Sequence, residues 1–142
     1  MTASDPSDLD RFVDAQEGTY ARALAEIRAG RKQSHWMWYV FPQFEGLGNS
    51  PTSRHYAIKS VEEARAYLND PVLGARLLEC FDALLQIDGP SAHDIFGSPD
   101  DMKLRSCATL FAFISRPESI FQETLQKYFD GKGDPVTLRL IR

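Results

Sequence analysis

A basic and aromatic segment between residues 28 and 59 holds the residues best suited to chemistry in this chain. It contains five bases and one acid, a net charge of +4, within a protein whose 142 residues carry a net charge of −4. Cations beside aromatic rings suit a flat anionic ligand, because the rings stack on the ligand and the cations meet its phosphate or carboxylate. The predicted ligand-binding residues are Arg31, Lys32, His35, Trp36, Trp38, Tyr39, Arg54 and His55, together with Lys103.

Two neighbouring acidic residues, Asp100 and Asp101, are the candidates to close this pocket on its far side. They stand at the start of a predicted helix, shortly before Lys103. A carboxylate near a histidine can carry out general acid–base chemistry, so the candidate catalytic residues are His35, Asp100 and Asp101. The alternative is that the two aspartates only stabilise the start of their helix.

Aromatic residues are concentrated in the basic segment. Five of the 16 Phe, Trp and Tyr residues of the chain lie within residues 36–44. Glycines follow this stretch, and glycine lets the backbone approach a ligand closely. The alternative to a stacking site is that Trp36, Trp38 and Phe41 fill the core beneath a loop.

Apolar residues at helical spacing predict the elements that must position this segment. Residues 8–30 read as helix, with a break near Gly18 and Thr19 as a new cap. Two longer predicted helices span 71–86 and 99–115, and we expect them to pack against each other as the central pair. The side chains that this pair is expected to bury are Leu77, Phe81, Leu110 and Phe111.

Capping signals mark where several helices begin. Ser60 precedes a glutamate by three residues, as in a capping box, and Asp70 stands before a proline, which suits the first helical position. Ser98 repeats the signal of a cap followed by proline. Residues 31–52 form a long ordered loop in this prediction, with a short extended or helical piece at residues 36–41. The predicted fold class is all-α: a compact multihelical single domain over residues 1–142, with two central helices and a long ordered aromatic and basic loop.

Charge and hydropathy exclude several classes of protein. With 16 Lys and Arg against 20 Asp and Glu, the chain lacks the basic excess of a dedicated nucleic-acid-binding protein. No apolar run approaches the roughly 20 residues that span a membrane. The polar, acidic first residues are unlike a signal peptide, so we expect a cytoplasmic protein.

The cysteines and histidines give no sign of a metal site. Cys80 and Cys107 lie 27 positions apart among apolar neighbours, and we expect them to be reduced and buried rather than joined in a disulfide. The close His and Cys pairs of zinc sites do not occur. No metal and no cofactor is predicted.

Three stretches of the chain carry specific motifs. They are RKQSHWMWYVFPQ at residues 31–43, GLGNS at 46–50 with YAI at 56–58, and FGSPDDMKLRSCATLF at 96–111. Together they resemble the DUF1810 family, a resemblance that spans nearly the whole chain. It implies a compact multihelical single domain from bacteria and no settled function. Some members are labelled calpastatin, but calpastatin acts as a disordered multi-repeat chain, and this sequence predicts a packed core.

Two functions from different classes remain open at this stage. The first is the binding of a small anionic ligand, nucleotide-like or ADP-ribose-like, in a pocket lined by residues 31–56, with hydrolysis as a candidate activity. The alternative is a non-enzymatic protein-interaction module that uses the same aromatic and basic loop. RNA or single-stranded DNA binding through stacked rings is disfavoured by the net charge. A concave pocket would favour the ligand, and a flat exposed aromatic patch would favour the protein partner.

Overall fold

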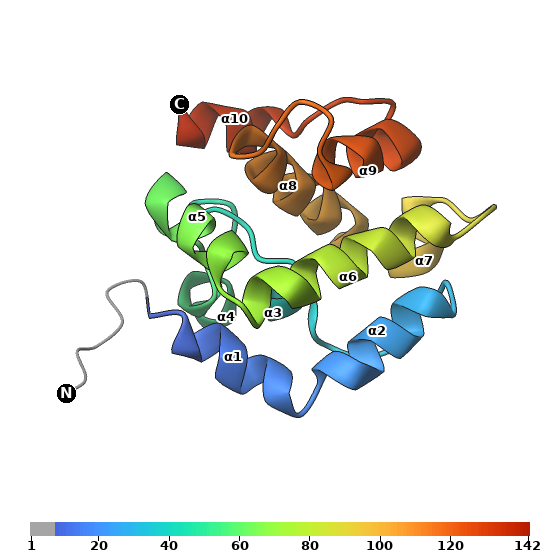
Figure 1. Cartoon of the computed structure of the whole chain (residues 1–142), viewed down its shortest axis with the longest axis horizontal. Helices are drawn as coiled ribbons and strands as arrows, with labels where there is room; N and C mark the ends of the chain where they lie inside the picture. Colours follow the sequence, from blue (N-terminus) through green and yellow to red (C-terminus); the bar gives the residue numbers. More distant parts are fainter. Residues whose placement is uncertain (1–7) are drawn as a thin grey trace.

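The computed structural model describes residues 8–142, in which helices are joined by short connections and loops (Figure 1). The helices are α1 (Asp10–Glu17), α2 (Tyr20–Arg28), α3 (Met37–Val40), α4 (Pro51–His55), α5 (Val61–Asn69), α6 (Leu73–Gln86), α7 (Ala92–Phe96), α8 (Asp100–Phe113), α9 (Ile120–Phe129) and α10 (Pro135–Ile141). The prediction of an all-α fold is confirmed. None of the helices within the described residues has the length and apolar composition needed to cross a membrane. The acidic first residues considered above lie outside the described part.

The first predicted helix breaks at Gly18, as expected, and α2 leaves in a new direction (Figure 1). This break lets α2 pack against α6 while α1 packs against α3. Thr19 precedes the first residue of α2, but its hydroxyl donates to the Ala15 carbonyl at 2.7 Å. Thr19 is the N-cap residue of α2, as predicted, but its side chain makes no capping hydrogen bond, because the hydroxyl bonds back to the preceding helix.

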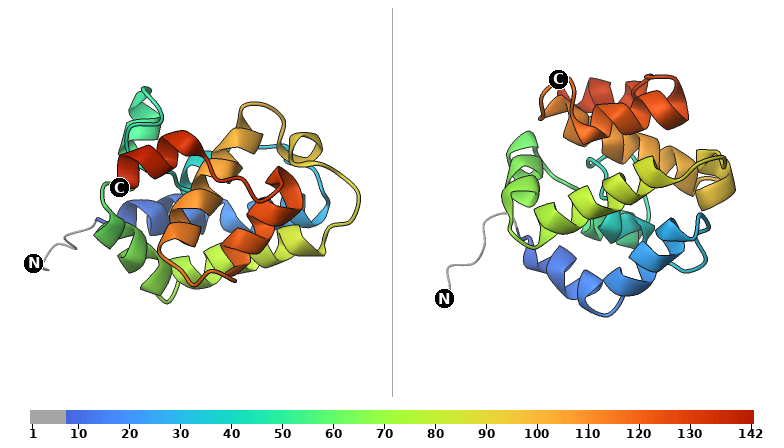
Figure 2. Two further views of the ribbon diagram at one scale, coloured as in Figure 1. Left: turned by 90° about the horizontal axis from the view of Figure 1, so that it is seen from above. Right: turned by 45° about the vertical axis from the view of Figure 1, so that its right-hand side comes forward.

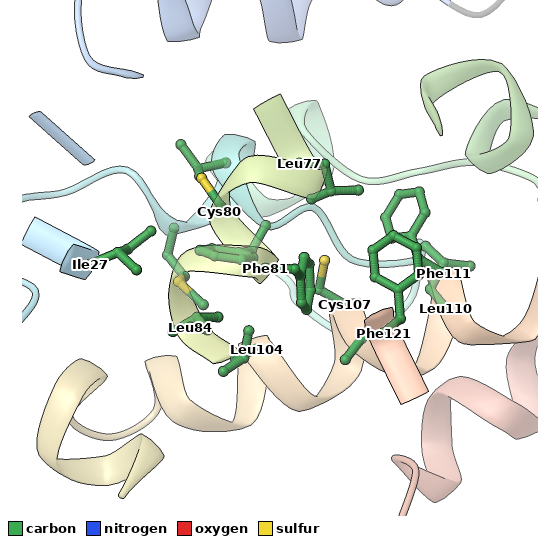
Figure 3. Packing of buried hydrophobic residues seen from close by; sticks show 14 of the residues in the cluster. Ile27, Leu77, Cys80, Phe81, Leu84, Leu104, Cys107, Leu110, Phe111 and Phe121 are labelled. Carbon is green, nitrogen blue, oxygen red and sulfur yellow. The ribbon is translucent and has the colours of Figure 1, made fainter. Parts of the chain in front are cut away.

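The core is centred on α6, α8 and α9. The four side chains expected in the core, Leu77, Phe81, Leu110 and Phe111, are all buried. However, α9 packs more extensively against α6 and against α8 than these two helices pack against each other, which corrects the expected central pair. Phe121 of α9 explains the difference, because its ring lies 4.9 Å from that of Phe81 and 5.6 Å from that of Phe111. Figure 3 shows the three rings in one cluster.

Local capping signals located most helix starts correctly. Ser60 Oγ accepts a hydrogen bond from the N–H of Glu63 at 3.0 Å, and the Asp70 carboxylate accepts from the N–H groups two and three residues later. The predicted bounds of α6 and α8 lie within two residues of the observed ones. Ser98 is the exception, because no side chain caps the start of α8.

The segment between α2 and α5 is ordered by two short helices, α3 and α4. Met37 and Val40 of α3 are buried, so this turn is attached to the core. The left view of Figure 2 shows α4 at the edge of the molecule. An isolated parallel bridge joins Phe44 to Ile58, on either side of α4. The predicted long loop is thus a folded segment that presents its polar side chains from fixed positions.

Candidate functional site

A pocket of about 180 Å³ lies between the aromatic and basic segment and the start of α8. α8 contributes Asp100 and Lys103 to its wall, and α4 contributes Thr52. The loop before α3 and α3 itself contribute Lys32, His35, Trp36, Met37, Trp38 and Tyr39. The fold therefore joins in one concavity two of the stretches that carry the sequence motifs.

Two lysines share one carboxylate in this pocket. Lys32 Nζ lies 2.9 Å from Asp100 Oδ2, and Lys103 Nζ donates to Asp100 Oδ1 at 2.9 Å. The exposed fractions of the Lys32, Asp100 and Lys103 side chains are 10%, 18% and 18%. Burial alone would raise the pKa of the Asp100 carboxyl, but the hydrogen bonds and charges of Lys103 and Lys32 outweigh it and lower the pKa. Asp100 is therefore an ionised counter-ion, and the three groups together carry one net positive charge.

Two tryptophans flank the lysines and play different parts. Trp36 is only 1% exposed, and its Nε1 donates to Glu26 Oε1 at 2.9 Å, so it fills the core, as the alternative interpretation proposed. Lys32 Nζ lies 5.1 Å from the centre of that ring. Trp38 is half-buried, and Lys103 Nζ lies 4.0 Å from its ring centre. Trp38 is therefore the tryptophan with surface left for stacking.

Glu26 of α2 fixes the loop that leads into the pocket. Its Oε1 accepts hydrogen bonds from the backbone N–H groups of Gln33 (2.8 Å) and Ser34 (3.0 Å). The same oxygen accepts from Trp36 Nε1, and Oε2 accepts from the Ser34 hydroxyl at 2.6 Å. Burial would raise the pKa of Glu26, but these donors outweigh it and lower the pKa to about 2. The loop is thus held by an ionised carboxylate.

Arg11 of α1 fixes the other end of the segment. Its guanidinium donates to the carbonyls of His55 and Ala57, both at 2.7 Å. It also forms an ion pair with Glu63 of α5 at 2.9 Å, in which the side chains are only 6% and 7% exposed. Glu63 accepts a further hydrogen bond from the N–H of Lys59. These contacts tie the end of α4 to α5, the next helix, and to α1, whose Arg11 lies 44 residues away from His55 in the sequence.

Four predicted site residues, Arg31, Arg54, His55 and Asp101, do not line the pocket. The first three are exposed. On an α-helix each residue turns the side chain by about 100°, so Thr52 and Arg54 of α4 point to roughly opposite sides. The expected convergence of five basic side chains is therefore reduced to two, from the loop before α3.

A larger groove of about 460 Å³ adjoins the pocket at Trp38 and Lys103, which line both cavities. The glycine-containing loop before α4 forms one of its walls, and residues of α8 and α10 also line it. Gly48 is tightly packed there, because a Cβ atom would lie 3.2 Å from Trp38 Cη2 and 2.7 Å from Ser53 Oγ. A side chain at position 48 would displace one of these residues, so the glycine shapes the groove.

Three residues of the site were missed by the sequence analysis. Thr52 and Met37 line the pocket, and Glu26 anchors its loop. A threonine near the start of a short helix and a glutamate on the face of a long one are ordinary in a sequence. The closest signal in the sequence was Met37, which lies among aromatic residues. An apolar residue in such a stretch is normally interpreted as part of the core, so it did not indicate a pocket.

The cysteines and the remaining acidic residues do not form a second site. Cys80 and Cys107 are free and buried. Burial raises the pKa of the Cys80 thiol to about 12 and that of Cys107 well above its ordinary value, so neither is a reactive thiolate. In the part of the chain that the structure describes, no three His, Cys, Asp or Glu side chains are grouped to hold a metal ion.

Comparison with known proteins agrees with the motifs. None of the curated proteins matches the chain significantly. Among solved structures, the crystal structure of the conserved hypothetical protein Rv1873 from Mycobacterium tuberculosis, at 1.38 Å, is 50% identical, covers 96% of this chain and 98% of that chain, and has a TM-score of 0.94. The family described as a protein of unknown function, DUF1810, matches residues 6–141. The chain therefore belongs to the DUF1810 family.

Proposed function

We propose that the chain binds a small anionic ligand with a flat ring, of the nucleotide or ADP-ribose class, in the pocket between residues 32–39 and the start of α8. The observation that carries this proposal is the pair of lysines on one carboxylate, beside the half-buried indole of Trp38. A concavity with buried or half-buried rings favours a small molecule over a protein partner, for which a flat exposed aromatic patch is typical.

The lysine pair supplies the cationic half of the site. Each ammonium group has three N–H donors, and each uses one of them on Asp100. Among the described residues neither ammonium has a second hydrogen-bond acceptor, so donors remain for a ligand. Asp100 offsets the repulsion between the two cations when no ligand is bound. A phosphate or carboxylate can then join the pair as a second acceptor.

The volume of the pocket limits which part of the ligand it holds. About 180 Å³ is below the roughly 300–1,000 Å³ of cavities that enclose a drug-sized molecule. The pocket therefore suits the anionic group, with a ring against Trp38 at its edge. The remainder of a nucleotide-sized ligand would extend into the adjoining groove of about 460 Å³.

His35 is the residue best placed for acid–base chemistry on such a ligand. It lines the pocket and is exposed. The lowered pKa of Asp100, which two lysines neutralise, makes that carboxylate a weak base. Asp101 lies 3.6 Å from His93 Nδ1 and does not line the pocket. A hydrolytic activity would therefore depend on His35, and the proposal itself concerns binding.

Isothermal titration calorimetry with ADP-ribose tests the proposal. We expect saturable binding that weakens about tenfold or more in Lys103→Met, because a charge-assisted hydrogen bond of about 1.5–3 kcal/mol is lost. Lys132→Met is the matched control, since Lys132 is an exposed lysine that lines neither cavity. The proposal fails if ADP-ribose, ribose 5-phosphate and pyrophosphate all fail to bind, or if the two variants bind with equal affinity.

A further inference from the structure

Four buried polar side chains line the groove beside the pocket, and three of them have hydrogen-bond partners within the protein. The hydroxyls of Ser53 and Ser106 donate to backbone carbonyls at 2.9 and 3.1 Å. The Asp134 carboxylate accepts from the N–H and the hydroxyl of Thr137 at 2.9 and 2.6 Å. The fourth side chain is that of Gln43, which is only 7% exposed.

The side-chain amide of Gln43 has no hydrogen-bond partner among the described residues. Only its backbone is engaged, since its carbonyl accepts from the N–H of Ile58 at 2.8 Å. No side-chain nitrogen or oxygen in the described part is both fully enclosed and unbonded, so the Gln43 amide opens into the groove that it lines. Water can satisfy this amide when no ligand is bound, and a ligand with the right polar edge would take the place of that water.

A glutamine amide presents one donor and one acceptor side by side. It matches a flat ring that carries the complementary pair at one edge, as adenine does with its exocyclic amine and N7. A primary carboxamide on a ring offers the same pair. A phosphate offers hydrogen-bond acceptors but no donor, so it cannot pair with both groups of the amide. Gln43 therefore suits the ring of a ligand rather than its anionic group.

We infer that Gln43 recognises the edge of a ligand ring that presents an adjacent donor and acceptor, and that the groove holds this ring while the anionic group lies at the lysine pair. The inference rests on the proposed function and names the substrate class of that same site: a nucleotide whose base is adenine-like or carries a carboxamide. Trp38 and Lys103 line both cavities, so one ligand can reach from the lysines to Gln43. The groove, of about 460 Å³, has room for a base and its ribose.

Calorimetry with AMP, nicotinamide mononucleotide and ribose 5-phosphate tests the inference, because the three share a phosphorylated ribose and differ in the ring. We expect AMP or nicotinamide mononucleotide to bind about tenfold or more tightly than ribose 5-phosphate. Gln43→Leu should remove that advantage and leave the affinity for ribose 5-phosphate unchanged. A preference for AMP assigns an adenine edge, and a preference for nicotinamide mononucleotide assigns a carboxamide. Gln33→Leu, at an exposed glutamine that lines neither cavity, should behave as wild type.

The outcomes separate this inference from the proposed function. Equal affinities of the wild-type protein for the three compounds would overturn the inference and leave the anion site standing. No binding by any of them would overturn the inference, and it would overturn the proposed function as well if ADP-ribose and pyrophosphate also fail to bind. The melting temperature supplies a second readout. Gln43→Leu loses no internal hydrogen bond, so its melting temperature should equal or exceed that of wild type. A drop of several degrees would assign Gln43 a structural role and overturn the inference.

Discussion

Glu26→Gln should loosen the loop that carries the lysine site. The wild-type carboxylate accepts four hydrogen bonds, from two backbone N–H groups, one hydroxyl and one indole N–H. Glutamine keeps the shape but removes the charge and replaces one acceptor oxygen with a donor. Hydrogen bonds to charged groups contribute about 1.5–3 kcal/mol each, and contact with water reduces that value. We therefore expect the free energy of unfolding to fall by about 1–3 kcal/mol at pH 7.

The pKa of Glu26 sets the pH window of this effect. In the folded protein the pKa is about 2, below its ordinary value of 4.5. The stabilisation is therefore complete above about pH 5 and is lost as the pH falls toward 2. Urea unfolding monitored by tryptophan fluorescence measures it at pH 7 and at pH 3. The difference in unfolding free energy between wild type and Glu26→Gln should shrink by about half or more at the lower pH.

Glu118→Gln is the matched control for this measurement. Glu118 is exposed and makes no hydrogen bond or ion pair with any described residue, so its substitution should change the unfolding free energy by less than about 0.5 kcal/mol at either pH. Equal effects of the two substitutions at pH 7 would refute the anchoring role of Glu26. An effect of Glu26→Gln that is the same at both pH values would refute its ionised state.

Two further predictions concern the core and the buried ion pair. Phe111→Ala should lower the unfolding free energy by roughly 3–5 kcal/mol, because the ring is fully buried and lies 5.6 Å from that of Phe121; a loss under about 1 kcal/mol in urea would mean that the core is misplaced. Arg11→Met should cost about 3–5 kcal/mol, because it leaves the buried Glu63 charge without its cation. Adding Glu63→Gln should restore part of that loss in the same assay, and a double variant less stable than Arg11→Met would contradict the explanation.

The helices could be predicted from the sequence because their signals are local. Ser60 and Asp70 cap helices within three residues of themselves, and apolar spacing identifies the buried face of each helix. The packing of α6 and α8 could not be predicted in the same way. It depends on Phe121 of α9, whose ring lies beside those of Phe81 in α6 and Phe111 in α8. No local sequence pattern indicates which two helices a third helix will pack against. Ser98 failed as a cap because its side chain makes no hydrogen bond to the first turn of α8, whereas the Asp70 carboxylate bonds to the N–H groups that lead into α6.

The candidate site could be predicted only in part. Charge and rings singled out Lys32 and Trp38, and the second motif singled out Asp100 and Lys103, all of which line the pocket. Which side chains of α4 face the pocket, and which donors bond to Glu26, depend on how the chain folds in three dimensions. Neither can be inferred from the composition of the segment. Sequence reasoning therefore identified two segments that line the pocket, but it could not tell which side chains of α4 face that pocket.

The net charge of the basic segment overstates the charge that a ligand meets. Arg28 and Lys59 each lie 3.7 Å from an acidic side chain outside the pocket, and exposed pairs of this kind contribute little to stability. Lys32 and Lys103 share Asp100, so the field in the pocket is that of one positive charge rather than four. Such a site suits a small anion and gives little advantage to a polyanion such as nucleic acid, whose binding scales with the number of phosphates neutralised. The proposed selectivity must therefore come from the indole surface and from the unpartnered amide in the groove, with charge only placing the anionic end.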